Sequence, residues 1–391
     1  EERHKDIAAG LQKITNDVIM SLADHLFNET KSTNICRAGG VALNCVTNSF
    51  LHEFGPFDNT FIQPAANDMG TALGAAYYIW NQILENKQSY IFTHPYIGPS
   101  FSDVSIEQAL GEAGAQFTKL TNPEKTAAAL IADGMVVAWF QGGMEFGPRA
   151  LGNRSILADP RRFNVISALN ETVKHRDYFR PFASSVLEEK AHEWFDIEKD
   201  TISDRYMLLS RRIRIDKICK IPGVSHVDGT SRIQTVNKEI NHSFYNLMSE
   251  FEKMTGIPIV LNTSFNDQEP IVCSPKEALK TCLKTNVDYL IIGEYLIDFG
   301  RSKYNASFFS DTDSFSEQAG FLMRLQTDFD FREHFCKTSD AILVRDKDAQ
   351  EMFGAVGEML HIIKEKMGRF MVEFKFCPNS TAIKDYIVSR R

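Results

Sequence analysis

The sequence predicts an α/β protein with more than one domain. Two short apolar strands near the N-terminus each lead into a glycine loop and then a helix, an order typical of α/β folds. Two later apolar strands, at residues 135–140 and 257–261, end in loops rich in glycine, asparagine or serine. A chain of 391 residues is also too long for one ordinary core, so we expect two or three domains.

The first block, residues 1–90, is expected to alternate helix, strand, helix, strand and helix. Its opening helix carries apolar residues at three- and four-residue steps and begins without methionine, so we expect a fragment of a longer protein. Strand 34–37 precedes the first glycine loop, and strand 60–64 precedes the second. Small residues after the second loop predict a helix packed closely against a sheet: Ala72, Gly74, Ala75 and Ala76.

Turn-forming residues over 86–103 predict a boundary before a second domain, residues 95–300. In this domain Asn122 and Pro123 predict the start of one helix, and a capping box at Ser274 predicts the start of another.

Residues 301–391 predict a small C-terminal α+β extension. Strands are expected at 341–344 and 369–376, around a helix at about 349–367. No role for this extension follows from its sequence.

Composition excludes several classes of protein. Gly and Pro together make 36 of the 391 residues and apolar residues 43%, which excludes collagen-like and disordered chains. The seven cysteines are scattered and form no CxxC pair, so we expect a reducing, cytoplasmic location and neither a disulfide framework nor a zinc ribbon. No apolar run approaches the ~18–20 residues of a membrane span.

The densest functional signal is a basic stretch between residues 149 and 180. It holds seven basic and three acidic side chains, a balance of +4 inside a chain of net charge −8. The basic residues are Arg149, Arg154, Arg161, Arg162, Lys174, Arg176 and Arg180. Charge runs usually form solvated faces. Here they alternate with glycine, proline and aromatic residues, and bidentate arginines with a mobile lysine suit a triphosphate or an acyl phosphate.

Two further signals are weaker. The turn 262–266 offers hydroxyls and amides after an apolar strand, although such turns often bond only their own backbone. The loops at Gly39-Gly40 and 67–70 can present backbone N–H groups to an anion. Asp68 can coordinate a metal ion or simply cap a helix.

Five segments in this order closely resemble the nodulation-protein-U type O-carbamoyltransferases, the family that includes tobramycin carbamoyltransferase. They are AGGVALN (38–44), QPAANDMGTALGAA (63–76), EFGPRALGNRSILADP (145–160), KHRDYFRPFA (174–183) and LNTSFN (261–266). The resemblance covers about residues 1–300.

The resemblance implies a two-step transferase. Residues 1–90 would be the C-terminal part of an ASKHA (actin/Hsp70-like) domain, similar to the tRNA threonylcarbamoyl transferases, and 95–300 a YrdC-like domain with a twisted mixed sheet. The YrdC-like domain would make carbamoyl-adenylate from carbamoyl phosphate and ATP with Mg²⁺. The ASKHA domain would pass the carbamoyl group to a hydroxyl of a small-molecule acceptor, with Fe²⁺ or another divalent metal. A homodimer is compatible with this interpretation.

The resemblance also implies site residues. The catalytic ones match a KxR pair and an SxN pair: Lys174, Arg176, Ser264 and Asn266. Those expected to bind ATP and carbamoyl phosphate are Arg149, Arg154, Arg180, Thr263 and, as a weaker candidate, Arg232. The adenylate would contact Gly39, Gly40 and Asn44 in the first block, and Asp68 would ligate the metal.

One departure and two alternatives qualify this interpretation. The HxxxH pair of the family is absent from the ten histidines, so we expect this chain alone to form carbamoyl-adenylate without completing transfer. Carbamoylation of a protein cysteine, as in hydrogenase maturation, is disfavoured by the reversed domain order and the lack of CxxC pairs. A YrdC-like module that binds nucleic acid without transfer activity is disfavoured by the acidic total charge.

Overall fold

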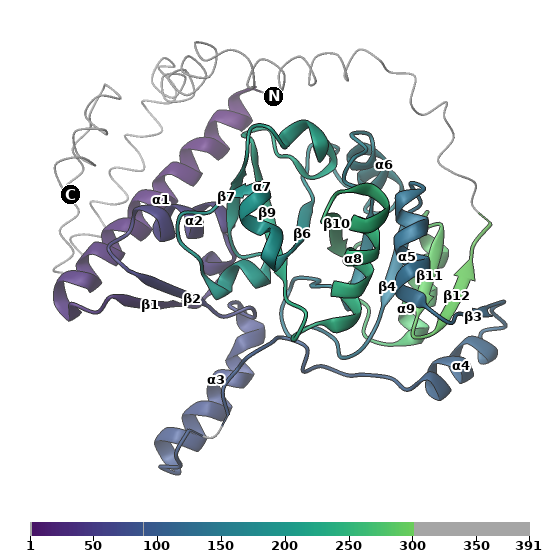
Figure 1. The fold of residues 1–391 in the computed structure, drawn as a ribbon. Helices are drawn as coiled ribbons and strands as arrows, with labels where there is room; N and C mark the ends of the chain where they lie inside the picture. The colour runs from purple at the N-terminus through teal and green to yellow at the C-terminus, as the bar shows by residue number, and fades with distance from the viewer. Residues whose placement is uncertain (1, 89, 301–391) are drawn as a thin grey trace. The chain divides into compact units, whose positions relative to one another are not determined.

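The computed structural model describes residues 2–88 and 90–300 (Figure 1). Contacts divide these residues into two units: helix α1 (Glu2–Thr30) belongs to the first, and the chain from Ser32 onward forms the second. The predicted opening helix is therefore confirmed. The predicted C-terminal extension, with its two strands and helix, lies outside the described residues. None of the helices in the described part is long and apolar enough to cross a membrane.

The second unit begins with a small parallel pair of strands. Strands β1 (Asn34–Arg37) and β2 (Asn59–Ile62) pair with Asn34 opposite Asn59. The helices that follow them are a 3₁₀ helix (Gly40–Leu43), α2 (Cys45–Phe54), a second 3₁₀ helix (Asp68–Gly70), α3 (Thr71–Tyr78) and a π-helix (Ile79–Ile83). This order confirms the predicted repetition of strand, glycine loop and helix.

The expected packing of the helix after the second glycine loop is wrong. No residue of α3 is buried, and the apolar side chains at its end and beyond it, including Tyr78, Trp80 and Ile83, are about half exposed or more. Small residues permit a close approach only where another surface faces them. Among the described residues nothing covers α3, which extends away from β1 and β2 (Figure 1).

Residues 118–298 build one mixed sheet, which confirms the predicted mixed α/β architecture. Its strands are β3 (Thr118–Lys119), β4 (Val137–Phe140), β5 (Arg154–Ala158), β6 (Ala183–Leu187), β7 (Phe195–Asp196), β8 (Ser210–Ile213), β9 (Thr230–Val236), β10 (Ile259–Ser264), β11 (Tyr289–Ile292) and β12 (Tyr295–Asp298). Their order is β3-β12-β11-β4-β5-β10-β6-β9-β8-β7. The pairs β4–β11 and β6–β9 are parallel and the others antiparallel. The finer ASKHA-like and YrdC-like assignments and the predicted domain boundaries stay predictions.

Six helices accompany these strands in the described residues. They are α4 (Asp103–Glu112), α5 (Pro123–Ala132), α6 (Val165–Thr172), α7 (Ala191–Trp194), α8 (His242–Thr255) and α9 (Pro275–Lys284). Short 3₁₀ helices span Glu188–Lys190, Ile202–Tyr206, Ile218–Lys220 and Pro222–Val224. The predicted helix starts are confirmed, since Asn122 caps α5 and Ser274 forms a capping box with Glu277 at α9. Helices α5 and α8 pack against each other, and Phe244 and Phe251 of α8 are fully buried.

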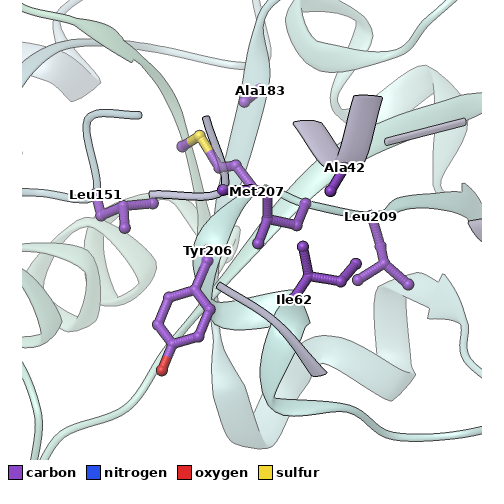
Figure 2. Close-up of a cluster of buried hydrophobic side chains, with 9 residues drawn as sticks. Ala42, Ile62, Leu151, Ala183, Tyr206, Met207 and Leu209 are labelled. Carbon is purple, nitrogen blue, oxygen red and sulfur yellow. The ribbon is translucent and has the colours of Figure 1, made fainter. Parts of the chain in front are cut away.

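An apolar cluster fixes the β1–β2 segment against the large sheet (Figure 2). Ala42 and Ile62 pack there with Tyr206 and Met207, all at most 2% exposed. Leu151 also belongs to this cluster, so the loop before β5 shares the core of the N-terminal segment. Burying these side chains removes apolar area from water and holds the first glycine loop in place.

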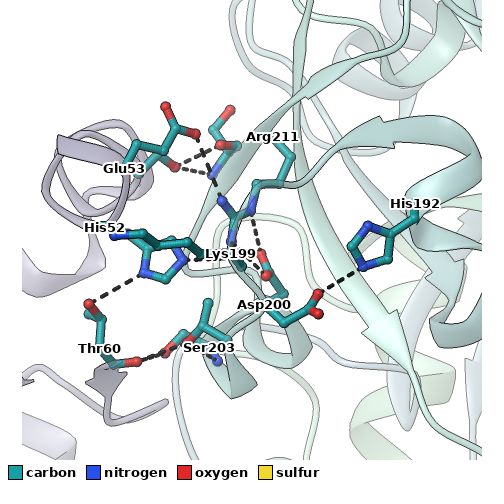
Figure 3. Close-up of polar contacts among 12 residues, drawn as sticks. His52, Glu53, Thr60, His192, Lys199, Asp200, Ser203 and Arg211 are labelled. Atoms are coloured by element: carbon teal, nitrogen blue, oxygen red, sulfur yellow. Dashed lines mark hydrogen bonds and ion pairs between the residues drawn. The ribbon is translucent and has the colours of Figure 1, made fainter. Parts of the chain in front are cut away.

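Polar contacts at the end of α2 reinforce this attachment (Figure 3). Buried His52 lies 3.0 Å from the Lys199 carbonyl, and burial lowers the pKa of its imidazole. Buried Arg211 pairs with Asp204 at 2.8 Å and lies 3.8 Å from Glu53 of α2. The N-terminal segment is therefore joined to the sheet by both apolar and polar contacts.

Candidate functional site

Lys174 lies buried just beyond the last residue of α6. Four neutral oxygen atoms of the turn after β10 lie within hydrogen-bond distance of the three N–H donors of its ammonium: the carbonyl and hydroxyl of Ser264, and the carbonyl (2.7 Å) and Oδ1 (2.8 Å) of Asn266. Burial, with the nearby Arg176 charge, lowers the pKa of Lys174 from 10.5 to about 7. The fold thus brings the KxR and SxN residues together from segments far apart in the sequence.

Arg176 follows Lys174 after a tight turn at His175. His175 between them has a left-handed backbone, φ 43°, a conformation that is costly for a residue other than glycine and that clusters at functional sites. The Arg176 guanidinium lies 4.8 Å from the centroid of the Phe182 ring, which faces it. The turn therefore fixes both cations at the end of α6.

Arginines from separate elements gather next to this turn. Burial, followed by the charges of Arg180 and Arg232, lowers the pKa of Arg176 to about 10. The Arg232 charge is the largest cause that lowers the pKa of Arg149, also to about 10. Within the described residues Arg149, Arg176 and Arg232 form no ion pair with an acid, whereas exposed Arg180 pairs with Asp177 at 3.3 Å. The charge of Asp177 acts on Arg176 in the opposite direction, without an ion pair. Arginines held near one another without an ion pair indicate a site for an anion.

Glu145 holds the loop that carries Arg149. Its buried Oε1 accepts the backbone N–H groups of Leu151 (2.7 Å), Asn153 (2.8 Å) and Arg154 (3.2 Å). Burial raises the pKa of Glu145, and these hydrogen bonds act in the opposite direction. One carboxylate oxygen therefore organises most of the loop between Arg149 and β5.

Arg154 lies in the core at the start of β5, with 0% of its surface exposed. Its guanidinium is 3.5 Å from the centroid of the Phe140 ring. Its Nη atoms donate, at 2.6 to 3.2 Å, to the carbonyls of Pro99, Gln141, Gly142 and Asn153. These contacts give Arg154 a structural role, and its role as a phosphate ligand stays a prediction.

Buried amides connect the central strands to the same loop. Gln234 on β9 donates to the Leu151 carbonyl at 2.7 Å and accepts from Ser185 on β6 at 2.7 Å and from Asn262 on β10 at 3.1 Å. Thr263, the next residue of β10, is partly exposed at the end of the strand. Strand β10 thus ends in the polar turn 262–266, and Gln234 on β9 anchors the loop that carries Arg149.

The first glycine loop borders the arginines. Nη2 of Arg149 approaches the Leu43 carbonyl at 3.5 Å. Gly39, with φ 96°, and Gly40 are exposed, and a Cβ at either would meet no atom within 4 Å. Asn44 caps α2 through its Oδ1. The predicted adenylate contacts therefore lie together on one open loop, next to one of the predicted phosphate ligands.

Ser210 joins this loop region to the strand of Arg232. Its backbone N–H donates to Ser49 Oγ of α2 at 2.8 Å, and its carbonyl accepts from the same hydroxyl at 2.7 Å. On β8, Ser210 also stands opposite Arg232 in the antiparallel register with β9. One residue thus links the helix capped by Asn44 to the arginine cluster.

Asp68 stands alone as a candidate metal ligand. It is exposed, and its carbonyl accepts from Thr71 Oγ1 at 2.6 Å. In the part of the chain that the structure describes, no group of three or more His, Cys, Asp or Glu side chains could hold a metal ion. The residues present therefore do not make up a metal centre, and Asp68 as a ligand stays a prediction.

Sequence reasoning missed three residues that hold the site: Glu145, Gln234 and Asn170. The side chains of all three bond the backbone of the basic loops. Backbone partners leave no mark in a residue pattern. The available signal for Asn170 was its position inside a helix, where asparagine is disfavoured unless its side chain is used.

The chain matches two family models. "Carbamoyltransferase N-terminus" matches residues 1–77, and "Carbamoyltransferase C-terminus" matches 128–298, together more than half of the chain. The chain belongs to the carbamoyltransferase family. Its C-terminal match contains every arginine of the cluster, together with Lys174 and Ser264.

Relatives of this chain include nodulation proteins. Nodulation protein NolNO of Sinorhizobium fredii is 42% identical over 300 residues, and NolO of Bradyrhizobium diazoefficiens 39% over 300. These matches take in 76% of this chain, but 44% and 55% of the two proteins. The chain thus spans about half the length of the curated relatives that it matches.

Two further proteins are less similar to this chain. A solved structure of full-length HypF in a phosphate- and nucleotide-bound form is 17% identical, with a TM-score of 0.33, over 47% of this chain and 23% of that one. Nodulation protein U of Azorhizobium caulinodans is 36% identical over 237 residues, 60% of this chain and 40% of that protein. The predicted membership of the nodulation-protein-U group is therefore confirmed.

Proposed function

We propose that this carbamoyltransferase chain forms carbamoyl-adenylate from ATP and carbamoyl phosphate, as the first half of carbamoyl transfer to a hydroxyl group of a small molecule. The observation that carries the proposal is a chain of interacting cations: the charge of Arg232 acts on both Arg149 and Arg176, and the charge of Arg176 acts on Lys174. In the described residues none of these three arginines forms an ion pair. A triphosphate carries the density of negative charge that such a cluster requires, and arginine matches its oxygens in pairs.

The proposed reaction has two steps, and each exchanges one bond at a phosphorus atom. Water first attacks the phosphorus of carbamoyl phosphate, the bond from that phosphorus to the carbamoyl oxygen breaks, and carbamate, inorganic phosphate and a proton are released. A carbamate oxygen then attacks the α-phosphorus of ATP, supplied as its Mg²⁺ complex. The bond from that phosphorus to the oxygen bridging to the β-phosphate breaks, and pyrophosphate leaves with the electron pair. Positioning and charge neutralisation dominate phosphoryl transfer of this kind, so no general base is required.

Each cation has a distinct part in this reaction. The guanidinium groups of Arg149, Arg176 and Arg232 neutralise the triphosphate, and exposed Arg180 adds to them from the rim. Lys174, with its pKa near 7, becomes fully charged when an anion arrives. Its present partners Ser264 and Asn266 hold it in place until then and are available to the carbamoyl group.

The first glycine loop is proposed to receive the product. Gly39, Gly40 and Asn44 would contact the adenylate, and support comes from the Leu43 carbonyl, which lies 3.5 Å from Arg149 on that loop. We expect no carbamoylation of an alcohol by this chain alone, and robust ATP-dependent carbamoylation would contradict that expectation.

The test is ATP–pyrophosphate exchange that depends on carbamoyl phosphate. Lys174→Ala and Ser264→Ala should each lower the exchange rate by about 100-fold or more, as loss of a preorganised donor does elsewhere. The matched control is Lys276→Ala, because Lys276 is an exposed lysine whose ion pair with Glu112 lies on the surface. Full exchange in both site variants would overturn the site assignment.

The same samples test the nucleic-acid alternative. ATP with carbamoyl phosphate should raise the melting temperature, whereas RNA should not. Stabilisation by RNA alone, growing steeply as salt is lowered, would identify a nucleic-acid module instead.

A further inference from the structure

We infer that Asn170 is a positioning residue of the anion site, which acts through Arg176 and sets the direction in which its guanidinium binds phosphate. The inference rests on the proposed anion site but not on the carbamoyl chemistry. It concerns a side chain that the sequence motifs do not mark and that touches no ligand itself.

The side-chain amide and the backbone carbonyl of Asn170 all bond the segment that follows its helix. Its Oδ1 accepts from Arg176 Nε at 2.7 Å, and its backbone carbonyl accepts the Arg176 N–H at 3.0 Å. Its Nδ2 donates to the carbonyls of Tyr178 (3.0 Å) and Arg180 (2.9 Å). With 0% of its surface exposed, Asn170 has no competing contact with water. One buried amide therefore fixes a loop that carries two cations.

These contacts leave Arg176 oriented but unoccupied. Asn170 takes the Nε, and the Phe182 ring covers one face of the guanidinium. Among the described residues no acceptor binds Nη1 or Nη2 of Arg176. An arginine held at its inner nitrogen with both outer nitrogens open presents the planar pair of donors that phosphate oxygens accept. Orienting it in advance lowers the entropy lost when the anion binds.

Asparagine is the side chain that this geometry requires. The acceptor must face Arg176 and the two donors must face the Tyr178 and Arg180 carbonyls, so both ends of the amide are needed. Aspartate keeps the acceptor, loses both donors and adds a charge that pairs with Arg176. Alanine loses every side-chain contact.

The experiment measures pyrophosphate binding to the whole chain by calorimetry in a double-mutant cycle. Asn170→Ala and Arg176→Ala should each weaken binding by about 10-fold or more, the scale of a charge-assisted hydrogen bond. If Asn170 acts through Arg176, the double variant should bind as weakly as Arg176→Ala alone. Asn170→Asp should also weaken binding, because the new carboxylate neutralises the guanidinium.

A matched control separates positioning from general stability. Asn122→Ala removes a helix cap of α5 and should lower the melting temperature while leaving pyrophosphate affinity unchanged. Additive effects of Asn170→Ala and Arg176→Ala, or wild-type affinity in Asn170→Ala, would overturn the inference. So would a wild-type chain that fails to bind pyrophosphate. A chain that shows the coupling but no carbamoyl-dependent exchange would overturn the proposed function and leave this inference intact.

Discussion

Two parts of the basic stretch 149–180 use the same residue type in opposite ways. Arg161 donates to both carboxylate oxygens of buried Asp159 at 2.7 to 3.1 Å, and Arg162 lies 3.5 Å from the same group. Arg149 and Arg176 have like charges as neighbours instead. Accordingly, hydrogen bonding to Asp159 raises the pKa of Arg161, whereas the pKa values of Arg149 and Arg176 are lowered. An ion pair with Asp159 therefore ties Arg161 and Arg162 to the fold, whereas no ion pair among the described residues ties Arg149 or Arg176.

The largest effect is expected from removing Glu145, whose carboxylate holds the loop that carries Arg149. Glu145→Ala leaves three buried N–H groups of the Arg149 loop without an acceptor and should lower the free energy of unfolding by roughly 3 kcal/mol or more. Glu145→Gln keeps an acceptor oxygen and should lose less. Urea unfolding measures both, and a Glu145→Ala variant as stable as the wild type would show that the loop does not depend on this carboxylate.

A direct contrast comes from one arginine of each kind. Arg149→Ala should weaken pyrophosphate binding by about 10- to 100-fold, because a charged donor to phosphate is lost. Arg161→Ala should leave that affinity unchanged and lower the free energy of unfolding by about 1 kcal/mol, since the Arg161 side chain is 34% exposed to solvent and Arg162 also lies 3.5 Å from Asp159. Calorimetry measures the pyrophosphate affinity of both variants, and urea unfolding measures their free energy of unfolding. Equal losses of pyrophosphate affinity in the two variants would show that Arg149 and Arg161 do not differ in their role.

A pH-dependent effect is expected from Lys174, whose pKa is lowered to about 7 by burial and by the Arg176 charge, although the charges of Asp267 and Glu269 act in the opposite direction. In the unfolded chain a lysine keeps a pKa near 10.4. Between about pH 7 and 10 the unfolded state therefore holds a proton that the folded state lacks, so this group makes stability rise with pH, by up to about 1.4 kcal/mol per pH unit. Lys174→Met should remove that slope. Parallel urea titrations at pH 7, 8 and 9 would contradict the assignment if the two slopes were the same.

Local features were predictable because their causes are local. The cap at Asn122 and the capping box at Ser274 are set by residues three positions apart, and both are confirmed. The packing of α3 was not predictable, because small residues describe one surface and say nothing about the presence of another.

The site was predictable in its cations and not in their partners. The basic stretch pointed to an anion, and the structure brings Lys174 to Ser264 and Asn266 as the motifs imply. The sequence could not distinguish Arg154, whose Nη atoms donate to backbone carbonyls, from Arg149. That difference depends on which loops fold over each side chain. The sequence could not reveal Glu145 for the same reason.

Ser210 links α2 to the strand of Arg232, and this link affects the free energy needed to reorganise the protein when a ligand binds. Because α2 and the strand of Arg232 both bond Ser210, the glycine loop and the arginines are linked through one residue within the second unit. The repulsion between neighbouring arginines is then overcome once, during folding, by contacts made elsewhere. Under the proposed function, an arriving triphosphate would meet donors already in place and would relieve that repulsion, which is the electrostatic condition for fast phosphoryl transfer.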